Sequence, residues 1–222
     1  MITRIVEGAD GARDASGVVV VVDVMRAFTT AAYAFAAGAS EIDLVATVEE
    51  AMEIPGFRMG EVGGRLIEGF DHNNSPSRLA GRRLDGRRAI MRTGSGTRCV
   101  AAATGASEIW LGSFVVASAT VRALAGRGEV TFVVSGAPHE GEEDIACAEL
   151  MAARLEDGAF SIETAIATVR NSRAAHRHLV NDADFPAEDV ACATAVDAFD
   201  FAMRAEWSGR RWTARRFPPV DG

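Results

Sequence analysis

GVVVVVDV, residues 17–24, is a run of β-branched residues with no polar side chain before Asp23. A continuous apolar run of this kind is typical of a strand buried on both faces, as in parallel sheets covered by helices. An alanine-rich segment that favours a helix follows at residues 29–37 and ends at Gly38. The stretch therefore predicts an α/β fold, in which a mostly buried sheet lies between two layers of helices.

The same alternation of strand and helix patterns continues toward the C-terminus. Strands are expected at residues 41–46, 87–92, 107–113 and 129–136, and helices at residues 47–54, 97–104, 114–124 and 141–158. Residues 161–179 and 187–207 are helical patterns with no strand between them, and we expect a surface extension after them. We therefore predict one domain over residues 1–222, closed by a helical C-terminal part at residues 161–222.

The composition excludes some classes of function. Hydrophobic residues make up 48% of the 222 residues, and the net charge is -8, so we expect neither a nucleic-acid nor a membrane partner. All 23 basic residues are arginine, so anion recognition falls to arginine and backbone N–H groups. The N-terminal segment is polar, no apolar run is long enough to span a bilayer, and the three cysteines are scattered. We therefore expect a cytoplasmic protein with reduced thiols.

Ligands of open α/β sheets bind at the carboxyl ends of the strands, so the residues there are the site candidates. Asp23 ends the first strand and is followed by Arg26, Thr29 and Thr30. One interpretation is an Asp23–Arg26 ion pair with Thr29 as helix cap. The other is an Asp23 ligand for Mg²⁺, with Arg26 and the helix N-terminus facing a phosphate or another anion. Met25 stands where phosphatases that form an aspartyl-phosphate carry a second Asp, which disfavours that mechanism.

The second candidate segment is RMGEVGGRLIEGFDHNNSP, residues 58–76. It places Glu61, Glu68, Asp71 and Asn74 within fourteen residues. Hard cations bind several oxygen ligands, and glycines let the backbone approach a ligand, so this cluster is a candidate metal site. An ordinary acidic loop is the alternative. We expect Asp71, Asn74 and Ser75 to lie in the wall of the site.

Two further segments follow predicted strands. MRTGSGTR, residues 91–98, is similar to a phosphate-binding loop, with Thr93, Ser95, Gly96 and Thr97, although a tight turn is equally compatible with it. It is neither a Walker A motif nor a dinucleotide fingerprint. In SGAPHEGEEDIACAE, residues 135–149, three acids start a helix. One interpretation is that these acids complement the helix dipole, and the other is that one of them reaches the cleft at the strand ends. His139, in the same segment, is a candidate general acid.

Taken in this order, the four segments resemble the 2-phosphosulfolactate phosphatase (ComB-type) family. Members show IDVLRATT, GE with GFDxGNSP, TTNGT and an ED–CAG helix, where this chain reads VDVMRAFTT, GEVGG, GFDHNNSP, TGSGT and EDIACAE. The resemblance implies an α/β phosphatase that depends on Mg²⁺ and hydrolyses a small phosphorylated sulfonate or carboxylate, with a place in coenzyme M biosynthesis.

The resemblance also implies residue roles. Asp23 and an acid from residues 61–71 hold the metal, Arg26 and residues 93–97 hold anionic groups of the substrate, and metal-activated water or a carboxylate attacks phosphorus. The predicted site comprises Asp23, Arg26 and Asp71 as catalytic residues, Asp23, Glu61, Glu68 and Asp144 as metal ligands, and Thr29, Thr30, Asn74, Ser75, Thr93, Ser95, Gly96 and Thr97 as phosphate-binding residues.

Two departures from the family pattern affect this prediction. Asn73 replaces a glycine, and we expect it to adopt a positive φ. Gly94 and Ser95 replace Thr and Asn, which removes a hydroxyl and an amide from the expected anion contact. A non-catalytic phosphoanion-binding or regulatory protein is therefore the alternative function. A third interpretation is an assembly role as a homodimer, with the arginine-rich tail at the subunit contact.

Overall fold

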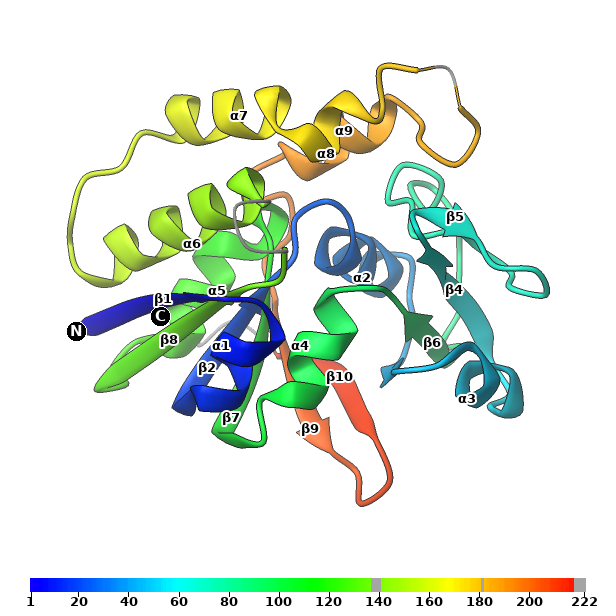
Figure 1. Ribbon diagram of the computed structural model, residues 1–222, viewed down its shortest axis with the longest axis horizontal. Helices are drawn as coiled ribbons and strands as arrows, with labels where there is room; N and C mark the ends of the chain where they lie inside the picture. The colour runs from blue at the N-terminus through cyan, green and yellow to red at the C-terminus, as the bar shows by residue number, and fades with distance from the viewer. Residues whose placement is uncertain (137–140, 181, 218–222) are drawn as a thin grey trace.

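The computed structural model describes residues 1–136, 141–180 and 182–217, and one ten-stranded sheet runs through it (Figure 1). The strand order is β1-β8-β2-β7-β9-β10-β3-β6-β4-β5. The strands are β1 (Ile2–Glu7), β2 (Ser16–Val22), β3 (Ile42–Val45), β4 (Phe57–Val62), β5 (Arg65–Leu66), β6 (Ala89–Arg92), β7 (Gly105–Gly112), β8 (Glu129–Val134), β9 (Ala202–Trp207) and β10 (Trp212–Phe217).

The strand predicted from the valine run is β2, and it is buried on both faces. Val19 and Val21 pack in one hydrophobic cluster, whereas Val20 and Val22 pack in another, because successive side chains of a strand point to opposite faces. The first cluster contains side chains of α1, α2 and α4, and the second contains side chains of α5, α6 and α7. The layered α/β/α prediction is confirmed.

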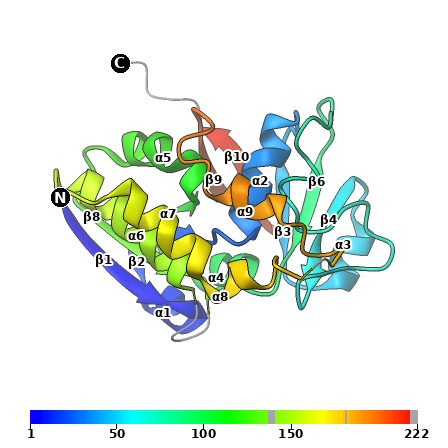
Figure 2. The ribbon, with the colours of Figure 1, turned by 90° about the horizontal axis from the view of Figure 1, so that it is seen from above.

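Apart from α1, which was not predicted, the helices lie within or close to the segments where the sequence predicts them. They are α1 (Gly8–Asp14), α2 (Ala27–Ala36), α3 (Val48–Glu53), α4 (Gly96–Ala102), α5 (Ala117–Leu124), α6 (Glu142–Leu155), α7 (Ile162–Asn171), α8 (Arg173–His176) and α9 (Glu188–Ala193), with a 3-10 turn at Phe114–Val116. Figure 2 shows α7, α8 and α9 crossing the molecule above the sheet. Within the described residues no helix is long and apolar enough to cross a membrane.

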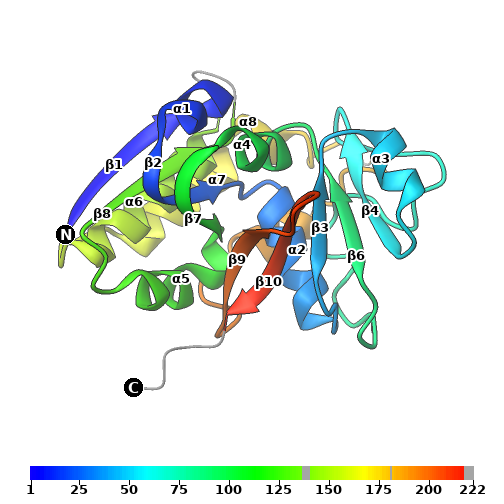
Figure 3. The same cartoon turned by 90° about the horizontal axis from the view of Figure 1, so that it is seen from below.

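The sheet consists of two parallel blocks joined by a hairpin. Strands β1, β8, β2 and β7 run parallel in one block, and β3, β6 and β4 run parallel in the other. The hairpin β9–β10 lies between β7 and β3 and is antiparallel to both (Figure 3). The two blocks therefore have opposite senses along the hydrogen-bonded ladder. Residues at the carboxyl ends of strands from both blocks nevertheless line one cavity.

This hairpin corrects the prediction of a wholly helical C-terminal part. The predicted helix at residues 187–207 is correct only for α9, and β9 occupies its end. The predicted surface extension is wrong for residues 212–217, which form β10 inside the sheet. Alanine has a high helix propensity, but Ala205 and Ala214 are buried opposite each other in the hairpin, where packing decides the structure.

Candidate active site

A cavity of about 610 Å³ lies where four strands end. Asp23 follows β2, Ser135 follows β8, Glu61 lies near the end of β4, and Thr93 follows β6, and all four line the cavity. The rest of its wall comes from residues 25–26, the turn at residues 63–64, Asn74, the starts of α4 and α6, and α8 with the segment after it. The expectation that polar strand ends gather at one place is met.

Two buried carboxylates, Asp23 and Asp144, lie beside the hydroxyl group of Ser135. Ser135 Oγ is 2.9 Å from Asp23 Oδ2 and 3.2 Å from Asp144 Oδ2. The other oxygen of each acid accepts a backbone N–H, from Ala27 at 2.9 Å and from Val24 at 2.7 Å. A hydroxyl group has one proton to donate, so Ser135 satisfies one carboxylate at a time. All these donors are neutral.

A third acid, Glu143, adds to this group. It is 5% exposed, and its Oε2 has no hydrogen-bond partner among the described residues. Burial raises the pKa of the Glu143 carboxyl to about 7; its own backbone N–H opposes this effect, and the charges of Asp23 and Glu142 add to it. Burial also raises the pKa values of Asp23 and Asp144, and the charges of Asp23 and Glu143 raise that of Asp144 further. The three acids therefore interact as one cluster.

Glu61 joins two glycine turns at the edge of the cavity. Its Oε1 accepts the N–H of Gly94 at 2.6 Å, and its Oε2 accepts the N–H of Gly64 at 2.5 Å. Its negative charge contributes to the raised pKa of Asp23. Of the predicted metal ligands, Asp23, Glu61 and Asp144 line the cavity, with their carboxylates in fixed orientations.

The loop after β6 contributes Thr93 and Ser95 to the cavity wall. Thr97 does not line the cavity, because its Oγ1 donates to the carbonyl of Thr93 at 2.9 Å and closes the loop. Gly96 lies against Asp23: an added Cβ would be 2.7 Å from Asp23 Oδ2. The second glycine of the GSGT motif therefore permits the close approach of the Asp23 carboxylate.

Arg26 lines the cavity but uses its guanidinium for contacts within the protein. Its Nη1 pairs with Asp189 Oδ2 at 2.8 Å and donates to the carbonyl of Asp184 at 2.8 Å. Its Nη2 donates to the carbonyl of Gly64 at 2.9 Å. The Asp23–Arg26 ion pair is therefore wrong, because Asp23 turns toward Ser135 and the backbone at the start of α2.

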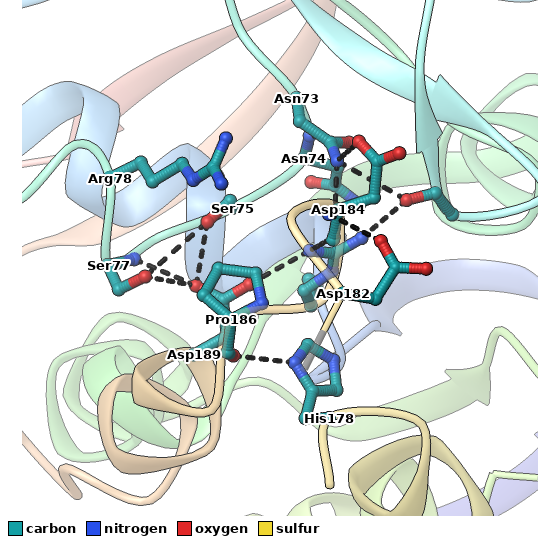
Figure 4. Close-up of polar contacts among 12 residues, drawn as sticks. Asn73, Asn74, Ser75, Ser77, Arg78, His178, Asp182, Asp184, Pro186 and Asp189 are labelled. Carbon is teal, nitrogen blue, oxygen red and sulfur yellow. Dashed lines mark hydrogen bonds and ion pairs between the residues drawn. The ribbon is translucent and has the colours of Figure 1, made fainter. Parts of the chain in front are cut away.

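The NNSP loop binds the segment at residues 182–189 (Figure 4). Asp189 is fully buried, and its Oδ1 accepts hydrogen bonds from Ser75 Oγ at 2.8 Å and Ser77 Oγ at 2.6 Å. Asn73 Nδ2 donates to Asp184 Oδ1 at 2.8 Å. Asn73 does not adopt the expected positive φ, and its side chain makes this contact instead. Asp189 was not predicted as a site residue, because it lies far from these residues in the chain.

Only one of the three residues predicted to form the wall on this loop lines the cavity. Asn74 lines it, and its Oδ1 is buried with no hydrogen-bond partner among the described residues. Ser75 is turned to Asp189. Asp71 is exposed, lies outside the cavity and accepts the N–H of Arg58 at 2.8 Å. Glu68 is also exposed and outside the cavity. The loop is therefore mainly a docking surface for the later segment.

The two threonines of α2 are also outside the cavity. Thr29 Oγ1 donates to the carbonyl of Val24 at 2.8 Å, and Thr30 Oγ1 is buried with no hydrogen-bond partner among the described residues. Asp23, rather than Thr29, accepts the N–H of Ala27 at the start of the helix. Both threonines lie on the buried side of α2 because this helix packs in the core.

Several cavity residues were missed in the sequence. Arg98 on α4, Arg173 on α8 and Arg177 after α8 all line it. His178 also lines it: the side chain is buried, its Nδ1 lies 2.7 Å from the carbonyl oxygen of Pro186, and burial lowers its pKa. Because the chain has no lysine, the sequence did indicate that any cationic side chain in the cavity would be an arginine. His139 lies outside the described residues.

The part of the chain that the structure describes contains no group of three or more His, Cys, Asp or Glu side chains placed to surround a metal ion. Mg²⁺, however, is commonly held by one or two carboxylates together with water and substrate phosphate. The carboxylates of Asp23 and Asp144 match that requirement, since both are buried and receive only neutral donors.

Comparisons with known proteins agree with the motifs at this cavity. A family model described as 2-phosphosulpholactate phosphatase matches residues 4–206. A probable 2-phosphosulfolactate phosphatase of Bacillus subtilis (strain 168) is 33% identical over 207 residues, which cover 89% of this chain and 90% of that protein. One of Synechococcus sp. (strain RCC307) is 36% identical over 166 residues, 69% of this chain and 66% of the relative. One of Deinococcus radiodurans is 37% identical over 147 residues, 62% of this chain and 61% of the relative.

Proposed function

The chain belongs to the 2-phosphosulfolactate phosphatase family, and we propose that it hydrolyses the phosphate ester of a small sulfonate or carboxylate with the help of Mg²⁺. The observation that carries the proposal is the cluster of Asp23, Glu143 and Asp144, three buried acids that line one cavity. The named hydrogen-bond donors to Asp23 and Asp144 are neutral. Three such acids are unfavourable as three anions, and a cation beside Asp23 and Asp144, or a proton on Glu143, relieves the repulsion.

Asp23 and Asp144 are the residues that would hold Mg²⁺. Their backbone hydrogen bonds and the shared Ser135 hydroxyl fix both carboxylates before any ligand arrives. When bound, the ion supplies positive charge that neutralises phosphate oxygens during phosphoryl transfer. Ser135 orients the two carboxylates, and Gly96 leaves the space that Asp23 occupies.

Glu143 is the proton-carrying group in this proposal. Its carboxyl lines the cavity, and its pKa of about 7 lets it exchange a proton near neutral pH. A group with such a pKa takes a proton from an attacking water or gives one to a leaving oxygen. Thr93, Ser95 and Asn74 offer neutral polar groups for phosphate oxygens in the same cavity.

The test is phosphate release from 2-phosphosulfolactate and related phosphoesters by the purified protein, with Mg²⁺ and with EDTA. We expect turnover with Mg²⁺ only, and Asp23→Asn should abolish it. Asp71→Asn is the matched control, because this acid is exposed and outside the cavity. No turnover of any ester, combined with thermal stabilisation by the same esters, would replace the phosphatase proposal with the non-catalytic binding function.

A further inference from the structure

The cavity has basic as well as acidic lining residues, and the two sets come from different elements. The acids Asp23, Glu143 and Asp144 lie at strand ends and at the start of α6, whereas the arginines belong to α4 and to α8 with its following residue. The principal influences on the pKa values of the three acids are burial, the charges of neighbouring acids and neutral hydrogen-bond donors, and no arginine is among them. Arg98 and Arg177 form no ion pair with these acids among the described residues.

Two of the cavity arginines have no carboxylate partner among the described residues. Arg177 donates from Nη2 to the carbonyl of Gly63 at 2.7 Å, and its guanidinium lies 4.4 Å from the centre of the Phe185 ring. Its position is thereby fixed while further N–H donors stay available. Arg98 is exposed and makes no hydrogen bond or ion pair within the described part of the chain. Both guanidinium groups are thus available for an anion from outside.

The other arginines near Phe185 differ from Arg177, because their guanidinium groups are paired with carboxylates. Arg26 and Arg65 also face the Phe185 ring, at 5.1 and 5.9 Å from its centre. Arg26 is paired with Asp189, and Arg65 is paired with acids of the segment at residues 182–189. Arg65 does not line the cavity. Of the three arginines at this ring, Arg177 therefore both lines the cavity and lacks a carboxylate partner among the described residues.

A substrate that carries a second anionic group needs a place for it away from the acid cluster, because like charges repel. A guanidinium binds carboxylate and sulfonate oxygens through two parallel N–H bonds, and the chain has no lysine to take this part. A cavity of about 610 Å³ also has room for more than a phosphate group. We propose that Arg98 and Arg177 form the subsite for the carboxylate or sulfonate of the substrate that is not transferred. This proposal rests on the proposed phosphatase function.

The experiment compares Arg98→Gln and Arg177→Gln with the wild-type protein under saturating Mg²⁺. The substrates are 2-phosphosulfolactate, 2-phospholactate and isopropyl phosphate, which carry two, one and no additional anionic groups. For the two anionic substrates we expect kcat/KM to fall about tenfold to hundredfold, mainly through KM. For isopropyl phosphate, and for inhibition by inorganic phosphate, we expect no change beyond about twofold. Arg177→Lys should recover only part of the loss.

Arg65→Gln is the control, because it removes an arginine from the Phe185 ring without altering the cavity lining. It should leave all substrates unaffected, and thermal unfolding should show that every variant is folded. Equal losses on the anionic and neutral substrates, or no loss on either, would overturn the subsite. Absence of turnover by the wild-type protein would instead overturn the proposed function. A loss confined to 2-phosphosulfolactate would assign the subsite to sulfonate rather than carboxylate.

Discussion

Replacing Glu143 by glutamine should make the metal-free protein more stable at neutral pH while removing its activity. Glutamine keeps the size of the side chain and removes the charge. Glu143 is 5% exposed, and its Oε2 has no hydrogen-bond partner among the described residues. The folded protein therefore holds an ionisable group in a place that disfavours its ionised form. Such a residue is retained at a cost in stability, which is common for active-site groups.

The magnitude follows from the pKa of this carboxyl, which is about 7 in the folded protein against an ordinary value of 4.5. Because the folded pKa is raised, the unfolded chain loses its proton first as the pH rises, and this loss favours unfolding. The interval is about 2.5 pH units, and each unit corresponds to about 1.4 kcal/mol. The advantage of glutamine should therefore be absent at pH 4.5, grow through the interval, and level off above pH 7 at roughly 3 kcal/mol.

Urea denaturation in EDTA at several pH values between 4.5 and 8 measures this difference. Glu149→Gln is the control, because Glu149 is an exposed acid on the same helix and its replacement should change the free energy of unfolding by less than about 0.5 kcal/mol at every pH. Phosphate release from 2-phosphosulfolactate is measured in parallel. A Glu143→Gln protein whose stability relative to wild type does not change with pH would refute the reasoning about the buried acid cluster.

Three other predictions use the same measurements. Gly96→Ala places a Cβ 2.7 Å from Asp23 Oδ2, so it should lower the free energy of unfolding by about 1–3 kcal/mol and reduce Mg²⁺-dependent turnover; unchanged kinetics would contradict the close approach. Asp189→Asn leaves the buried guanidinium of Arg26 without its carboxylate and should cost about 3–5 kcal/mol in urea denaturation, whereas Asp182→Asn, which breaks an exposed pair, should cost far less. Burial lowers the pKa of His72, so the unfolded chain binds that proton first, and stability should fall below about pH 6.5 more steeply in the wild type than in His72→Asn; parallel pH curves would contradict this.

The sequence was sufficient to predict the layered fold because local patterns determine it. The valine run of β2 alternates between two hydrophobic clusters, and Thr47 accepts the N–H of Glu50 at the start of α3 as a capping residue should. The strand pair β9–β10 was not predictable in the same way. The residues of β9 fit the end of a helix equally well, those of β10 fit a surface extension, and only their pairing with β7 and β3 selects the strand conformation.

The candidate site was predictable where a residue stands at a strand end. Asp23, Glu61 and Thr93 line the cavity for that reason. Asp71 and Ser75 belong to the same motif, but one holds the backbone of β4 and the other holds Asp189. The partner of Ser75 lies 114 positions away in the chain, so spacing carries no information about it. A motif can therefore be diagnostic of a family while several of its residues stabilise the fold rather than contact a substrate.

The position of the β9–β10 hairpin between the two parallel blocks also affects how the protein folds during translation. The strands of the hairpin are the last to be synthesised among those of the sheet, yet they lie at its centre. Until residues 202–217 have left the ribosome, the facing edges of β7 and β3 are both unpaired. Unpaired edges of this kind are templates for aggregation. A nascent chain that stalls before the hairpin therefore exposes two unpaired strand edges that the completed chain covers, and it is more prone to aggregate than the completed chain.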